Sequence, residues 1–285
     1  MTDRSPFKTA VVAVVAFWIL VFVLLPNLLV LAASVLARDE VRFIRPGFTL
    51  AHYRALMSTE ILGIFVRSIA YAAGTTAICL AVGYPFAFLL ARSSARKLLL
   101  MLVVIPFWTS SLVRTYALII VLKANGLINT LLLETGLIQQ PLPLLYSNTA
   151  VFIGLVYTLL PFMILPLYAA MEKFDPALME AGYDLGASRL QVLRHILLPV
   201  TLPGIIAGAT MVFLPALGLF YVPDLLGGAR SMLLGNLIKN QFLAARNWPL
   251  GAAASMTLTL LMGLLLWAYF VSVRRYGDPR EALTR

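Results

Sequence analysis

Six long apolar stretches follow one another along this chain, and each can cross a membrane as a helix, which takes roughly 20 residues. Hydrophobic residues make up 61% of the chain and charged residues only 12%, which is more apolar surface than a water-soluble core can bury. The sequence therefore predicts an all-α, polytopic membrane protein with one transmembrane domain over residues 1–285. The expected spans are 9–37, 66–91, 98–122, 149–171, 203–223 and 250–273.

Charge predicts the orientation of these spans. The first apolar stretch exceeds the signal-peptide core of about 7–15 residues, so we expect it to be retained as a span. Six spans place both ends on one side, and Lys and Arg are more frequent there, with Arg4 and Arg285 among them. The positive-inside rule then places both termini in the cytoplasm. The net charge of +10 is interpreted as basic loops beside anionic lipid rather than as a nucleic-acid interface.

Residues 172–200 form a polar, jointed segment between the fourth and fifth spans. Asp175 is placed to cap a short helix, and Pro176 suits its first position. Gly186 is placed to end that helix in the left-handed conformation. An exposed joint of this kind, held between membrane spans, is suited to docking on a soluble partner.

A second short helix follows the glycine joint. Ser188 and Gln191 have the three-residue spacing of a capping box. Pro199 is expected to end this helix, and the fifth span is expected to start near Pro203. Further prolines and glycines, among them Pro215, predict a kinked fifth span.

The jointed segment resembles the EAA motif of ABC-importer permeases. Three residues separate Glu180-Ala181-Gly182 from Gly186, nine more separate Gly186 from Ile196, and one separates Ile196 from Leu198-Pro199. The family has alanine at the position of Gly182, a departure that could loosen the first short helix. The stretches 105–114, 159–162 and 218–228 are similar to polyamine permeases, most of all to the B-type permease subunit of spermidine/putrescine importers.

This resemblance implies a type I ABC-importer permease fold with alternating access, located in the bacterial cytoplasmic membrane. The implied partners are a second, similar permease, two ATPase subunits and an external solute-binding protein. The chain itself would bind no cofactor, since ATP and Mg belong to the ATPase partners. The residues implied in ATPase coupling are Glu180, Ala181, Gly182, Asp184, Gly186 and Ala187.

Residues that could support chemistry are sparse. The chain has no phosphate-binding Gly-x-x-x-x-Gly-Lys-Ser/Thr loop, so we expect it not to hydrolyse ATP. His52 and His195 lie too far apart in the predicted topology to share a metal, and no pair of acids lies within the spans. The alternatives are a permease for iron, thiamine or sulfate, or a polytopic membrane enzyme.

Asp224 is the predicted substrate ligand, because a polyamine needs carboxylates for its ammonium groups and aromatic faces for cation–π contacts. The competing accounts are a helix-end residue held by the Gly227-Gly228 turn, or a contact for the binding protein. Arg67 and Arg114 have the wrong sign for a cation path, and we interpret them as snorkelling side chains, with a gate salt bridge as the alternative. The candidate aromatic residues are Trp108, Tyr116, Tyr157, Phe220 and Tyr221, which could equally be packing or interface residues.

Overall fold

The computed structural model describes residues 6–39, 41–228 and 231–276, so Arg4 and Arg285 of the charge comparison lie outside the described residues. Within these ranges six helical segments are long and apolar enough to cross a membrane, as predicted. They cover Ala10–Ser34, Thr59–Arg92, Ser111–Glu134, Asn148–Glu172, Arg189–Gly218 and Trp248–Val271. The all-α class is confirmed.

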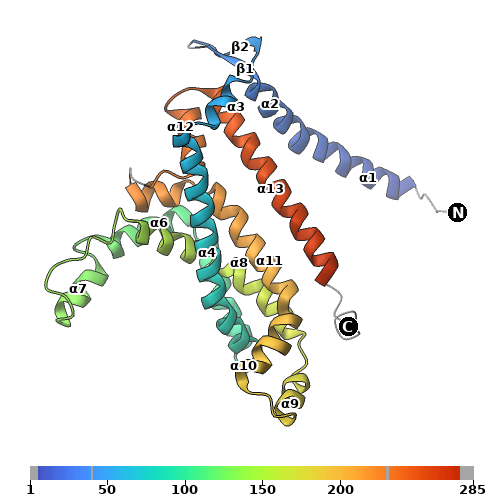
Figure 1. The fold of residues 1–285 in the computed structure, drawn as a ribbon, viewed down its shortest axis with the longest axis vertical. Coiled ribbons are helices and arrows are strands. Elements are labelled where there is room, and N and C mark those ends of the chain that lie inside the picture. Colours follow the sequence, from blue (N-terminus) through green and yellow to red (C-terminus); the bar gives the residue numbers. More distant parts are fainter. Residues whose placement is uncertain (1–5, 40, 229–230, 277–285) are drawn as a thin grey trace. The chain divides into compact units, whose positions relative to one another are not determined.

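The helical elements follow one another along the chain (Figure 1). They are α1 (Pro6–Ile19), η1 (Leu20–Leu24), α2 (Leu25–Ser34), α3 (Ala51–Leu56), α4 (Thr59–Arg92), α5 (Arg96–Val104), η2 (Ile105–Trp108), α6 (Ser111–Leu122), α7 (Leu127–Glu134), α8 (Asn148–Glu172), α9 (Ala177–Asp184), α10 (Arg189–Val192), η3 (Leu193–Leu197), α11 (Leu198–Gly218), η4 (Pro223–Gly227), α12 (Leu234–Leu243) and α13 (Trp248–Tyr276).

By its internal contacts the chain divides into two compact units, one of residues 1–63 and 237–261 and the other of residues 64–236 and 262–285. The first unit contains an antiparallel hairpin of β1 (Leu36–Asp39) and β2 (Phe43–Phe48), which the sequence analysis did not predict. The Asp39 carboxylate closes its turn by accepting from the backbone N–H groups of Arg42 and Val41, at 2.7 and 2.8 Å. These bonds, that of Arg42 first, hold the pKa of Asp39 below its usual value.

The second unit is built on α8 and α11, which lie side by side (Figure 1). Glycines on α11 permit the close approach. An added Cβ on Gly204 would lie 2.5 Å from the Cβ of Ala170, and one on Gly208 would lie 2.7 Å from the Sδ of Met163. Small residues at such crossings bring membrane helices together without a hydrophobic driving force.

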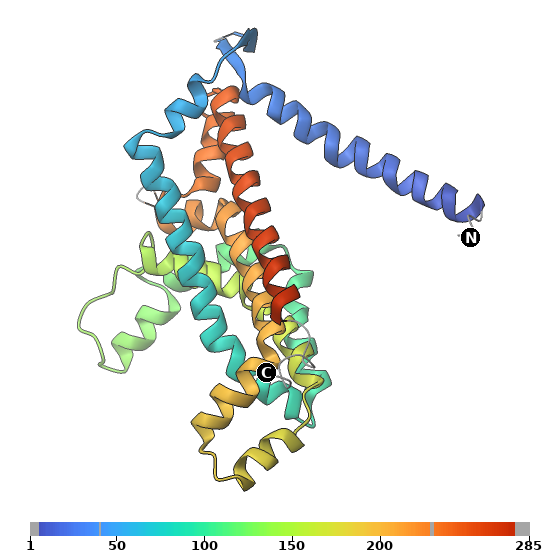
Figure 2. The ribbon, with the colours of Figure 1, turned by 45° about the vertical axis from the view of Figure 1, so that its right-hand side comes forward.

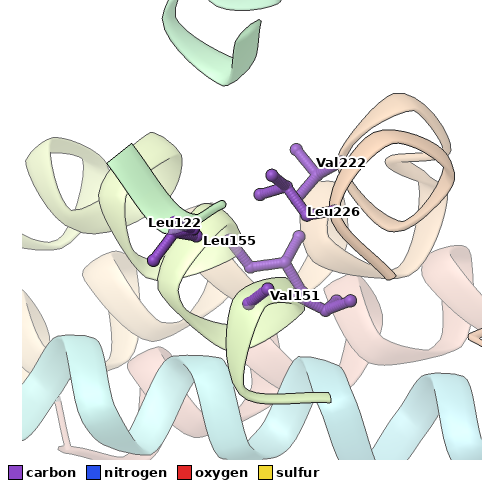
Figure 3. Packing of buried hydrophobic residues seen from close by; sticks show 6 residues of the cluster. Leu122, Val151, Leu155, Val222 and Leu226 are labelled. Atoms are coloured by element: carbon purple, nitrogen blue, oxygen red, sulfur yellow. The ribbon is translucent and has the colours of Figure 1, made fainter. Parts of the chain in front are cut away.

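A buried apolar cluster joins α8 to the end of α6 and to the segment around η4. Figure 3 shows its side chains converging from these elements. Its fully buried members are Leu122, Ala150, Val151, Leu155, Val222 and Leu226.

The third apolar segment differs from its predicted form. Residues 98–122 do not make one helix, because α5 and η2 end at Trp108 and Thr109 is extended, with φ −93° and ψ 145°. Pro106 lacks a backbone N–H, and the Thr109 hydroxyl donates to the Pro106 carbonyl at 2.8 Å. A new helix, α6, then starts at Ser111.

The fifth apolar segment also differs, and the prediction that Pro199 ends the second short helix is wrong. Helical structure continues from Arg189 to Gly218 through α10, η3 and α11. In η3 the Leu198 N–H donates to the Leu193 carbonyl, five residues back, so the chain enters Pro199 from a widened turn. Pro199 lies in the first turn of α11, where a backbone N–H has no required partner within the helix, so the missing N–H of proline costs little. The helix ends at Gly218, before the predicted end of the span at residue 223.

Candidate functional site

Hydrogen bonds formed within the jointed segment, residues 172–200, define its first helix. The Asp175 carboxylate accepts from the Ala177 N–H at 3.0 Å, as a cap would, and α9 begins at Ala177, one residue after Pro176. At the other end Gly186 has φ +84°. Its N–H donates to the Tyr183 carbonyl at 2.9 Å, and the Ala187 N–H donates to the Gly182 carbonyl at 3.0 Å. This pair of bonds is a Schellman motif, and it reverses the chain at a fixed angle.

The second helix of the jointed segment starts with the predicted capping box. The Ser188 N–H donates to Gln191 Oε1 at 2.7 Å, and the Gln191 N–H donates to Ser188 Oγ at 3.4 Å. Figure 2 shows the two short helices in yellow, meeting at the turn, with the second continuing into α11. No break separates this second short helix from α11, so the two form one continuous helical segment from Arg189 to Gly218.

Gly182 marks the contact between the two short helices. An added Cβ at this position would lie 2.7 Å from Ile196 Cδ1 and 3.3 Å from Val192 Cγ2. The glycine, which replaces the alanine of the EAA motif, therefore lets α9 pack closely on the α10–η3 helix.

The remaining coupling candidates lie at the surface of the jointed segment. Glu180, Ala181 and Asp184 are exposed. Apolar side chains accompany them, since Leu185 is 88% exposed and Leu190 is 72% exposed. Isolated exposed leucines are common, but a group on a jointed loop between spans is typical of a docking surface.

The sequence analysis missed the side chains that tie this segment to the neighbouring spans. Arg92, at the end of α4, donates to the sulfur of Met179 at 3.1 Å, and its guanidinium lies 3.7 Å from the Phe88 ring centroid. Arg96 pairs with Glu172 at 3.6 Å. A groove of about 430 Å³ separates α4 from the jointed segment, and Tyr84, Phe88, Met179, Tyr183 and Leu193 line it. The signal in the sequence that could have revealed these contacts is the basic cluster of Arg92, Arg96 and Lys97, which directly follows an apolar run.

The second candidate site surrounds Asp224, which is exposed in η4, after the break that follows Gly218. The Asn236 side chain donates to Asp224 Oδ1 and, at 2.8 Å, to the Phe220 carbonyl. Asn236 is itself held by the Leu233 N–H, which donates to its Oδ1 at 3.2 Å. Asn236 thus orients the Asp224 carboxylate, and no sequence pattern had indicated it.

The structure brings together only some of the candidate aromatic residues. Phe220 and Tyr221 form an edge-to-face pair beside Asp224, with centroids 6.1 Å apart. The Tyr221 hydroxyl accepts from Ser111 Oγ at 2.7 Å. Among the described side chains no ring-to-ring contact joins Trp108 or Tyr116 to this group, and these two are 85% and 55% exposed.

Tyr157 lies beside a cation instead. The guanidinium carbon of Arg114 is 5.8 Å from the Tyr157 centroid and 5.4 Å from the Phe107 centroid. The Nε of Arg114 is buried and has no hydrogen-bond partner. Arg114 is half-buried, and part of its charged group lies against aromatic rings.

Six apolar helices, an exposed jointed segment before the fifth span and a polar group after it define a membrane permease. Residues 80–280 match the family of binding-protein-dependent transport system inner membrane components. The chain belongs to this family, and it is a transport subunit rather than a catalyst.

Relatives with known names are similar over nearly the whole chain. The chain is 47% identical over 276 residues to the spermidine/putrescine transport system permease protein PotB of Salmonella typhimurium, covering 96% of each chain. It is 48% identical over 266 residues to PotB of Escherichia coli, covering 93% of this chain and 97% of that protein. A bacterial alginate ABC transporter, crystallised with its alginate-bound periplasmic protein, has the same type I permease fold, with a TM-score of 0.77, 17% identity and 96% coverage of each chain.

Proposed function

We propose that this chain is a permease subunit of an ATP-driven importer and forms half of the translocation path for polyamines such as spermidine and putrescine. The observation that carries the proposal is the 47–48% identity, over nearly full length, to two spermidine/putrescine permeases. Asp224 and its aromatic neighbours have the chemistry that an extended polycation requires.

The partners in this proposal are a second, similar permease, two ATPase subunits that bind ATP and Mg, and an external solute-binding protein. The ATPase subunits dock on the jointed segment, where Leu185 and Leu190 are exposed. Closure of the ATPase pair moves this segment, and the continuous helix from Arg189 to Gly218 transmits the movement to the path. The spans then open outward, accept the solute from the binding protein and reverse after hydrolysis.

The identity of the substrate is tested by ATPase measurements on the reconstituted complex. ATP hydrolysis is measured with binding proteins loaded with spermidine, putrescine, iron, thiamine or sulfate. We expect stimulation by the polyamine-loaded proteins alone. Stimulation by one of the other loaded proteins, with none by polyamine, would contradict the proposed substrate.

The proposed orientation, with both termini in the cytoplasm, is tested by cysteine labelling in a Cys79→Ser background. Cys79 is buried, so its replacement leaves the surface unchanged. Ala95→Cys and Leu185→Cys are expected to react with a membrane-impermeant maleimide only from the cytoplasmic side. Val41→Cys is the control, because Val41 is 84% exposed in the turn of the hairpin, and it should react only from outside. The reverse pattern would invert the topology.

Replacing Asp224 tests the substrate path. We expect Asp224→Asn to lower polyamine uptake about tenfold, the loss typical of one charge-assisted hydrogen bond. Glu134→Gln, which neutralises an exposed acid at the end of α7, is the matched control and should transport normally. Binding-protein docking is measured in parallel. Normal uptake by Asp224→Asn, or a loss explained by docking alone, would show that Asp224 is not a substrate ligand.

A further inference from the structure

Arg114 occupies an electrostatically unfavourable position. It lies in the first turn of α6 (Ser111–Leu122), where free backbone N–H groups already carry partial positive charge. Among the described residues no carboxylate lies within ion-pair distance of its guanidinium. Its Nε is buried without an acceptor, which is costly for a charged donor. An ionisable side chain kept in a membrane span under such conditions indicates a function.

The compensation comes from two aromatic rings on other elements. The guanidinium carbon lies 5.4 Å from the Phe107 centroid and 5.8 Å from the Tyr157 centroid, both within the range of a cation–π contact of about 6 Å. Phe162 holds Phe107 edge-to-face at 5.2 Å. The rings thus form a site for an organic cation, and the protein's own side chain occupies it.

We propose that Arg114 is a built-in cation that occupies this aromatic site and excludes the polyamine from it in the conformation described. The inference rests on the proposed function, because it assigns a gating step to the same path. The N-terminal end of α6 carries partial positive charge, as Arg114 does. A positive helix end together with an arginine is an effective barrier to cations. An ammonium group can contact Tyr157 and Phe107 only after Arg114 has left.

The first turn of α6 is positioned to couple this exchange to the rest of the path. Ser111, three residues before Arg114, donates to the Tyr221 hydroxyl at 2.7 Å. Tyr221 lies two residues before η4 (Pro223–Gly227), the short helix that carries Asp224. A shift of the start of α6 that withdraws Arg114 therefore also pulls on the segment that presents the carboxylate.

The test is equilibrium binding to the purified permease–ATPase complex, without nucleotide and without binding protein. The probes are radiolabelled spermidine and tetramethylammonium, a simple cation–π ligand. We expect Arg114→Gln and Arg114→Met to raise the affinity for both probes about tenfold, because the competing charge is removed. Arg114→Lys should remain close to the wild type, since it keeps a cation beside the rings. Adding Tyr157→Leu to Arg114→Gln should abolish the gain.

A purely structural role for Arg114 predicts the opposite direction, since its loss would lower affinity or leave it unchanged. Unchanged or weaker binding of tetramethylammonium by both neutral variants, in complexes of normal composition, would overturn the inference. Tetramethylammonium keeps this outcome separate from the proposed substrate. If polyamine-loaded binding proteins fail to stimulate the wild-type complex, the polyamine proposal fails, while tetramethylammonium binding still decides the role of Arg114.

Discussion

Gly186→Pro is expected to leave the chain in the membrane and to reduce ATPase-coupled uptake at least about tenfold. Proline holds φ near −65°, whereas Gly186 has φ +84°, and proline also removes the N–H that donates to the Tyr183 carbonyl. The Schellman turn must then be rebuilt, and α9 changes its direction relative to the helix that continues into α11. Nothing lies within 4 Å of an added Cβ at this glycine, so the effect comes from the backbone rather than from a steric clash.

The chain contains a matched control for this variant. Gly136 ends α7 with φ +72°, also has no atom within 4 Å of an added Cβ, and donates to the Leu133 carbonyl at 3.0 Å. Gly136→Pro damages the same kind of turn outside the jointed segment and should retain coupling. Pull-down of the ATPase from detergent and uptake by proteoliposomes are the two measurements. Equal ATPase recovery and equal uptake in both variants would show that the jointed segment does not couple to the ATPase.

Glu180→Lys is a milder probe of the same surface. Glu180 is exposed in the first turn of α9, where its negative charge complements the helix start. Charge reversal should weaken ATPase recovery without changing the membrane level of the chain. An effect equal to that of Gly186→Pro would indicate a charge contact rather than turn geometry as the main determinant of docking.

Gly204→Leu is expected to destabilise the second unit by about 3 kcal/mol or more, at the upper end of the overpacking range. An added Cβ would lie 2.5 Å from the Ala170 Cβ and 3.0 Å from the Pro166 carbonyl oxygen. The backbone oxygen cannot rotate away as a side chain can, so α8 and α11 must separate. The gain in helix propensity from glycine to leucine, about 0.8–1 kcal/mol, is too small to offset this.

Gly263→Leu provides the control, because an added Cβ at Gly263 meets nothing within 4 Å. It makes the same change of side chain on another apolar helix, α13. Thermal unfolding in detergent, followed by loss of the monodisperse peak, should show a lower midpoint for Gly204→Leu only. Equal midpoints in the two variants would mean that the α8–α11 crossing does not limit stability.

Local signals account for what the sequence predicted well. The six spans follow from runs of apolar residues whose backbone must be satisfied within the helix. The joint at Gly186 and the box at Ser188 depend on bonds between residues only a few positions apart, so their spacing is visible in the sequence.

Local signals failed at two places, the helix end predicted at Pro199 and the hairpin after the first span. Pro199 marks a helix end by propensity, yet the widened turn of η3 lets the helix continue. The hairpin after the first span was missed because its turn is closed by Asp39 rather than by a glycine pair.

By itself the sequence determined the class of protein, the number of membrane spans and the jointed segment, because hydrophobic run length and helix capping act along the chain. Only the tertiary structure decided that Asn236 holds the Asp224 carboxylate and that Arg114 lies over the ring of Tyr157. Asn236 lies 12 positions from Asp224, and Arg114 and Tyr157 come from different helices. Such pairs form only when helices pack, and packing depends on shape complementarity between residues such as Gly204 and the Pro166 carbonyl, which no local pattern records.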